Sequence, residues 1–167
     1  MLKKLSILIG SSISLFVLWM IGLEKLYAQV LKFGTSILLA PFSDVSTHLR
    51  IVHNHPDFCV AVGKEGYCMQ MELFGLSIVV LLSWYVLLIA LKPEKKRILM
   101  ILKYLAIFYF LQILTMSTLA LYEYGTFFQQ ANEALRQSFI IIALVFIIHD
   151  NYLYEVFSFK NKQTSSS

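Results

Sequence analysis

The sequence predicts an all-α membrane protein with four transmembrane helices, and with an extracytoplasmic amphipathic helix and a small β-hairpin between the first two spans. Hydrophobic residues make up 58% of the 167 residues and charged residues only 14%, whereas soluble domains carry roughly 25% charged residues. Four apolar runs are each long enough for a helix to cross about 30 Å of hydrocarbon. This composition excludes a water-soluble globule and a disordered chain.

The predicted spans cover residues 5–22, 73–91, 98–122 and 138–157. With their connections they form a single integral membrane domain, residues 1–162, followed by a disordered polar tail, residues 163–167. Pro93 ends the second span because proline cannot continue helical hydrogen bonding. The first span has one alternative, a cleaved secretory signal, which needs small residues around its cleavage site. The best match, Leu26-Tyr27-Ala28, begins with a bulky residue, so we expect a retained anchor.

The placement of basic residues predicts that both termini lie in the cytoplasm. This orientation puts nine basic residues inside and five outside, as the positive-inside rule requires. The inside set is Lys3, Lys4, Lys92, Lys95, Lys96, Arg97, Lys103, Lys160 and Lys162, and the outside set is Lys25, Lys32, Arg50, Lys64 and Arg136. We therefore expect a multi-pass protein of the cytoplasmic (inner) membrane, with the segment between the first two spans facing outwards.

Residues 23–40 predict the amphipathic helix, because apolar and polar positions alternate there at helical spacing. The apolar positions are Leu23, Leu26, Tyr27, Val30, Leu31, Gly34, Ile37 and Leu38, and the polar ones are Glu24, Lys25, Gln29, Lys32 and Ser36. Continued straight from the first span, this helix would reach about 54 Å, well beyond the bilayer. We therefore expect a bend near Gly22, after which the helix either rests on the outer lipid surface or offers a docking face to another protein.

Residues 57–71 predict a β-hairpin, because two short runs of β-forming residues flank a Gly-Lys pair. Glycine at the first central position is typical of a type II′ turn. With Gly63 and Lys64 in the turn, Cys59 pairs with Cys68 at a position where the Cα atoms lie about 4.5 Å apart. Because this segment is expected on the oxidising side of the membrane, we predict a Cys59–Cys68 disulfide.

Three histidines and an aspartate, His48, His53, His55 and Asp57, lie close together just before the first cysteine. Their spacing lacks the regularity of a tetrahedral metal site. We interpret this run as a polar loop at the interface or against a partner, with a metal site and a pH-responsive histidine cluster as alternatives. No cofactor is predicted.

A second enzymatic alternative uses Cys68 as a nucleophile. Cys68, Arg136 and His149 follow one another in the order found in membrane-embedded transpeptidases of the exosortase and archaeosortase group. However, His149 lies thirteen residues beyond Arg136, and a helix places it about 20 Å deeper. A general base must reach its nucleophile directly, so this spacing disfavours the enzyme.

Polar residues inside the spans are the remaining candidates. His149 and Asp150 either form a proton relay or reach the inner headgroups. Gln112 shares one face of the third span with two threonines, and we expect it to bond across helices. Small residues at Ser6, Gly10 and Ser14 share a face of the first span and predict close helix packing.

In layout the chain resembles the small accessory membrane proteins of exosortase-type sorting systems. The shared pattern is a first span, an amphipathic stretch (27–42), an outer hairpin (58–71), a span ending in a basic turn (92–97) and two further spans. The resemblance implies a non-enzymatic accessory protein that presents its outer helix and hairpin to a membrane protein partner; it transfers no site residue. The alternatives are an immunity protein against a pore-forming bacteriocin, and a cysteine-dependent transpeptidase or thiol oxidoreductase. The partners expected are the lipid bilayer and a membrane protein, without nucleic acid.

Overall fold

The computed structural model describes residues 2–53, 55–154 and 156–157, and most of them are helical. The helices are α1 (Leu2–Leu18), α2 (Glu24–Leu39), α3 (Glu72–Leu91), α4 (Lys95–Ser117) and α5 (Thr126–Tyr154), with a π-helical segment η1 (Trp19–Leu23) and a 3₁₀ segment η2 (Thr118–Tyr124). Three strands, β1 (Val45–Val52), β2 (His55–Val62) and β3 (Glu65–Gln70), lie between α2 and α3. The predicted tail, residues 163–167, lies outside the described residues.

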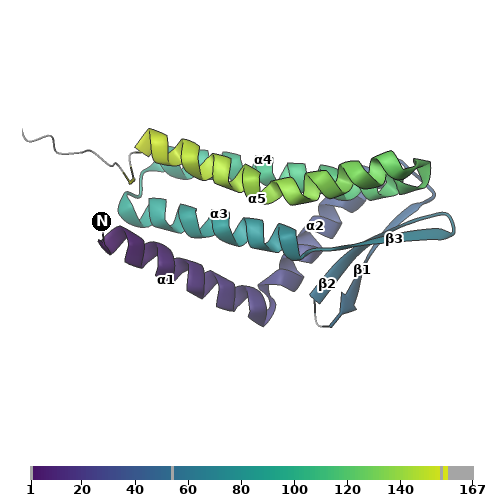
Figure 1. Ribbon diagram of the computed structural model, residues 1–167, viewed down its shortest axis with the longest axis horizontal. Helices are drawn as coiled ribbons and strands as arrows, with labels where there is room; N and C mark the ends of the chain where they lie inside the picture. The colour runs from purple at the N-terminus through teal and green to yellow at the C-terminus, as the bar shows by residue number, and fades with distance from the viewer. Residues whose placement is uncertain (1, 54, 155, 158–167) are drawn as a thin grey trace, which may run out of the picture.

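A kink at Gly22 divides the first helical segment into two parts. Gly22 has φ 156° and ψ −4°, a conformation that residues with a side chain rarely adopt. Before the kink, α1 packs along α3; after it, α2 turns towards the sheet and packs on α4 and on β1 and β2 (Figure 1). The bend expected near Gly22 is therefore present, and it places α2 against the protein.

Helix α3 lies at the centre of the bundle. It packs between α1 and α5 and also meets α4, and its buried side chains include Phe74, Leu81 and Leu88. At Lys92 the backbone leaves the helical conformation, immediately before Pro93. Of the part of the chain that is described, four helical stretches are long and apolar enough to cross a membrane: Leu2–Leu39, Phe74–Leu91, Lys95–Tyr122 and Thr126–Tyr154.

The strands form an antiparallel sheet in the order β1-β2-β3. The register of the predicted hairpin is correct, since Cys59 lies opposite Cys68 and Val62 opposite Glu65. The sulfur atoms of the two cysteines lie 2.01 Å apart, joined as a disulfide.

The hairpin is present, but the segment before it, which was predicted to be a polar loop, forms a third strand of the same sheet. The segment Val45–Val52 pairs with β2 along its whole length. Its exposed residues alternate with partly buried ones, and Leu49 contributes to the core, so one face of β1 is covered by the protein. A two-stranded hairpin is marginal alone, and a third strand backed by a helix stabilises it.

Two helices also differ from their predicted bounds. α5 begins at Thr126 rather than at 138, because its polar first turns continue the helix with Asn132 buried against the neighbouring elements. The third predicted span begins earlier, at Lys95, and its last residues form the 3₁₀ segment η2.

The small residues of the first span do not pack as predicted. Ser6, Gly10 and Ser14 are exposed, and a Cβ atom added at Gly10 meets nothing within 4 Å. Instead, α1 approaches α3 through another face, where the Ser11 hydroxyl lies 3.4 Å from the carbonyl oxygen of Ser83.

The close approach of α2 and α4 depends on Gly34. A Cβ atom there would lie 2.3 Å from Ile113 Cδ1 and 2.6 Å from the Tyr109 hydroxyl. We expect Gly34→Leu to lower the stability of the detergent-solubilised protein by about 1–3 kcal/mol, because overpacking forces the two helices apart. Gly10→Leu, on the open face of α1, is the matched control. Equal unfolding midpoints for the two variants would contradict the packing of α2 on α4.

Candidate functional site

The candidate site is the end of the molecule where α2, the sheet, η2 and the first turns of α5 meet. Polar contacts fix α2 there. The Tyr27 hydroxyl donates to Gln112 Oε1, and the Gln112 amide reaches Ser77 Oγ at 3.5 Å. Gln112 is fully buried and joins α2, α3 and α4, so the predicted bonding across helices is present.

Two further contacts tie α2 to the sheet. The hydroxyls of Ser36 and Thr47 lie 2.5 Å apart, and His55 Nδ1 lies 3.1 Å from Glu24 Oε2. Glu24 is buried, whereas the His55 side chain is half exposed. Only part of the predicted apolar face of α2 is buried, since Tyr27, Leu31 and Gly34 face the protein.

The rest of that apolar face is uncovered. Leu26, Phe33 and Ile37 are 60%, 68% and 60% exposed, and Val30 is 46% exposed. These four residues recur at helical spacing and form one stripe along α2, here called the α2 stripe. Tyr109 donates a hydrogen bond of 2.8 Å to the carbonyl oxygen of Val30, so α4 holds the backbone beneath the stripe.

The two faces of the sheet differ in chemistry. Because side chains alternate along a strand, Leu49, Phe58 and Met69 share the face that meets the core. The opposite face carries His48 beside the Cys59–Cys68 disulfide, and Arg50 opposite Asp57 in the strand register. An edge contact between the rings of Tyr67 and Tyr122, 5.4 Å between centroids, anchors β3 to η2.

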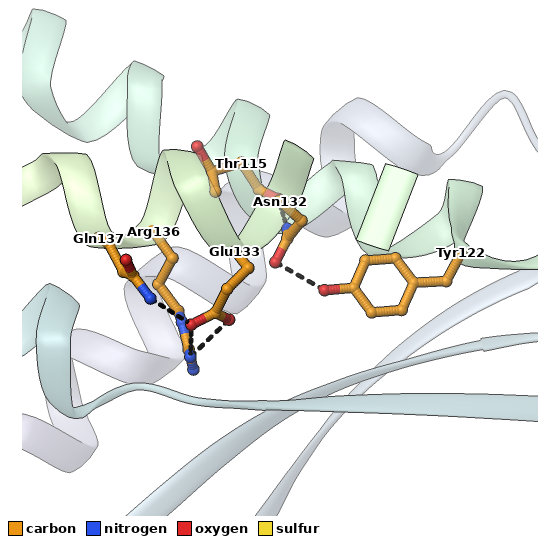
Figure 2. A network of polar contacts seen from close by, with 6 residues as sticks. All are labelled: Thr115, Tyr122, Asn132, Glu133, Arg136 and Gln137. Carbon is orange, nitrogen blue, oxygen red and sulfur yellow. Dashed lines mark hydrogen bonds and ion pairs between the residues drawn. The ribbon is translucent and has the colours of Figure 1, made fainter. Parts of the chain in front are cut away.

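Asn132 organises a polar network between α4, η2 and α5 (Figure 2). Its Nδ2 donates to the carbonyl oxygen of Thr115 and to Thr118 Oγ1, both at 2.8 Å. Its Oδ1 accepts a hydrogen bond of 2.8 Å from the Tyr122 hydroxyl. Asn132 is 1% exposed, so a buried amide is bonded at both ends and holds three segments together.

A second polar group lies further along α5. Glu133 accepts two hydrogen bonds of 2.6 Å from Arg136 Nη2 and one of 2.8 Å from Gln137. Figure 2 shows these three side chains gathered on one side of α5, beside the Asn132 network. The Arg136 charge is therefore balanced within its own helix.

The histidines that the sequence placed together are dispersed. His48 lies on the outer face of β1, His53 in the turn after it with φ 49°, and His55 beside Glu24. Among the residues that the structure describes, no group of three histidine, cysteine or acidic side chains is arranged to hold a metal ion. Asp57 is partly buried in β2, opposite Gln70 of β3.

At the other end of the bundle, Asp150 faces the interior. It is fully buried on α5, and both carboxylate oxygens lack a hydrogen-bond partner among the described residues. Its neighbour His149 is half exposed, with Nδ1 3.7 Å from Asp150 Oδ1 and 3.2 Å from the Tyr104 hydroxyl. The two neighbours therefore differ in exposure, with His149 at the surface of the protein and Asp150 in its interior.

Sequence reasoning missed Asn132, which lies before the predicted start of the fourth span, and it missed the contact that Tyr122, the last residue of the predicted third span, makes with it. One signal in the sequence could have indicated its burial: Asn132 is spaced so that it shares a helix face with Phe139 and Ala143 of the apolar span. Asparagine is mostly exposed in proteins, and a buried one needs partners. Here those partners come from a different helix, which a one-dimensional pattern does not reveal.

Asn132→Leu tests the network. We expect it to destabilise the protein by about 1–3 kcal/mol, because it removes the acceptor of the Tyr122 hydroxyl and one of the donors to the Thr115 carbonyl oxygen. The measurement is the unfolding midpoint in detergent. Gln130→Leu, at an exposed position of the same helix, is the control; a loss of stability as large in this variant would show that the effect is not specific to the network.

Comparison with known proteins finds no matching family model, no matching curated protein and no matching solved structure. The function is therefore argued from the geometry of this site.

Proposed function

We propose that the chain is a non-enzymatic accessory protein of the cytoplasmic membrane that presents α2 and the sheet, outside the cytoplasm, to a membrane protein partner. The observation that carries this proposal is the α2 stripe. It is apolar and uncovered, and the helix beneath it is fixed by Gln112, Tyr109 and the sheet. Rigid surfaces bind at a lower entropic cost than flexible ones.

The lengths of the helices support this placement. α5 has 29 residues and is about 43 Å long, whereas the hydrocarbon core is about 30 Å thick. The surplus is its polar beginning, which contains Asn132, Glu133 and Arg136. These turns pack on η2, which contacts β2 and β3, so in this proposal the membrane surface runs below the sheet and α2 lies at the interface.

The basic residues favour the orientation with this end outwards, as counted from the sequence. Outside the cytoplasm, a disulfide persists. Cys59 and Cys68, the two cysteines of the chain, are bonded to each other. The transpeptidase alternative requires a free thiolate, and the observed pairing supplies none. We place the accessory role in a protein-sorting or envelope system, in keeping with the layout resemblance.

A second candidate, an immunity protein that binds a toxin's membrane segment laterally, is favoured by one observation. Ser6, Gly10 and Ser14 form an open small-residue face on α1. Small residues allow two helices to approach closely in a membrane. This candidate predicts that the partner binds along α1 rather than along the α2 stripe.

The orientation is tested by cysteine labelling. We expect Lys64→Cys, in the β2–β3 turn, to react in intact cells with a maleimide that cannot cross the membrane. Lys95→Cys, at the start of α4, should react only after the cells are opened. The native cysteines are paired and leave the background low. Labelling at position 95 but not at 64 in intact cells would reverse the orientation.

The docking surface is tested by photocrosslinking in the native host. A photoreactive phenylalanine analogue at Phe33, on the α2 stripe, should form a discrete adduct with one protein. The same analogue at Phe110, an exposed position of α4, should mark lipid alone. Adducts from Ser14 on α1 in place of Phe33 would support the immunity candidate, and no protein adduct at any position would contradict both.

A further inference from the structure

A groove runs between α1 and α5, over the surface of α3. Both helices pack on α3, and the hollow between them measures about 400 Å³ and opens to the surface. Its walls include Leu8 and Ser12 of α1 and Ile148 and Asn151 of α5, and its floor includes Val80 and Trp84 of α3. The volume falls within the roughly 300–1,000 Å³ typical of small-molecule sites.

The lining is mainly apolar and carries no charged side chain. The Trp84 ring lies 6.2 Å from the Phe157 ring, and the two close one end of the hollow. Asn151 is already engaged, since its Oδ1 accepts a hydrogen bond of 2.9 Å from the Phe157 backbone N–H. An occupant of this groove is therefore held by contact with hydrocarbon side chains, as an acyl chain is.

The positively charged side chain of Lys4 lies at the end of the same groove. Lys4, Leu8 and Ser12 follow one another at four-residue spacing and so share one face of α1. Lys4 Nζ donates a hydrogen bond of 2.5 Å to the carbonyl oxygen of Val156, next to Phe157 of the lining. An ammonium group has three donors, so two remain for an anion. Lys3 beside it is exposed.

We propose that this groove binds one acyl chain of an anionic phospholipid whose phosphate pairs with Lys4 and Lys3. The proposal rests on the proposed orientation, which puts these lysines at the cytoplasmic surface. Anionic lipids are attracted there by basic residues at helix ends, by about fivefold in affinity per lysine. The apolar groove accommodates the acyl chain of the lipid, and the two lysines favour a negatively charged headgroup.

The test uses the two tryptophans of the chain, Trp19 and Trp84. Trp19→Phe leaves only Trp84 in the groove, and Trp84→Phe leaves only Trp19, which packs against Gly75. Each full-length variant is reconstituted into phosphatidylcholine vesicles, and phosphatidylglycerol or phosphatidylcholine with brominated acyl chains is added in increasing fractions. Bromine quenches tryptophan emission on contact, so the quenching curve reports lipid at the groove.

We expect Trp84 emission to be half quenched at an about 25-fold lower fraction of brominated phosphatidylglycerol than of brominated phosphatidylcholine, since each of the two lysines contributes about fivefold. Adding Lys3→Gln and Lys4→Gln to the Trp19→Phe variant should abolish this difference. The matched control, Lys95→Gln with Lys96→Gln, removes the same charge from the start of α4 and should retain it. The emission of Trp19, measured in the Trp84→Phe variant, should be quenched equally by the two lipids.

Equal quenching of Trp84 by the two lipids overturns the proposal, as does an equal loss of preference in both lysine variants. Quenching that falls as the protein density in the vesicles rises also overturns it, in favour of a second copy in the groove. These outcomes leave the proposed function standing. No quenching of Trp84 by either lipid likewise overturns the proposal, because no acyl chain then reaches the groove. If the protein does not float with the vesicles on a density gradient, it is not in the bilayer and the proposed function fails as well.

Discussion

The backbone conformation of Gly22 decides how the rest of the chain is arranged. A straight helix from α1 through α2 would run on past the end of α3, and α2 would not turn onto α4 and the sheet. With the kink, α1 stays on α3 while α2 contacts α4, β1 and β2. Because an added Cβ at Gly22 meets no neighbouring atom, the requirement for glycine there is one of backbone conformation rather than of space.

The redirected helix makes a small sheet possible. Three strands form a sheet too small to bury a core by themselves, and its inner face needs a covering layer. α2 supplies that layer, in contact with β1 and β2 and with the Ser36 hydroxyl beside that of Thr47, while Tyr122 of η2 holds the β3 side. The disulfide then adds a short local link. The sheet is thus stabilised by α2, the same helix that carries the uncovered α2 stripe.

The sequence was most informative where one local rule decides the structure. Pro93 limits α3, and the Gly63 turn fixes which residue faces Cys68, so both could be predicted. It was least informative where burial depends on distant partners. β1 contains polar and charged residues at alternate positions, and its strand character follows from pairing with β2. The open face of Gly10 likewise follows from which side of α1 meets α3, which small-residue spacing does not encode.

The two ends of the bundle handle buried polar groups in opposite ways. At the end of the bundle next to the sheet, the Asn132 side-chain amide is hydrogen-bonded through both its nitrogen and its oxygen. A fully bonded network of this kind is rigid. At the far end, the buried carboxylate of Asp150 accepts no hydrogen bond from the described residues and lies 3.7 Å from the ring nitrogen Nδ1 of the half-exposed His149. A satisfied network suits a surface that must keep its shape for a protein partner. The amide network thus fixes the end that carries the sheet, whereas the groove between α1 and α5 at the other end is lined mainly by apolar side chains.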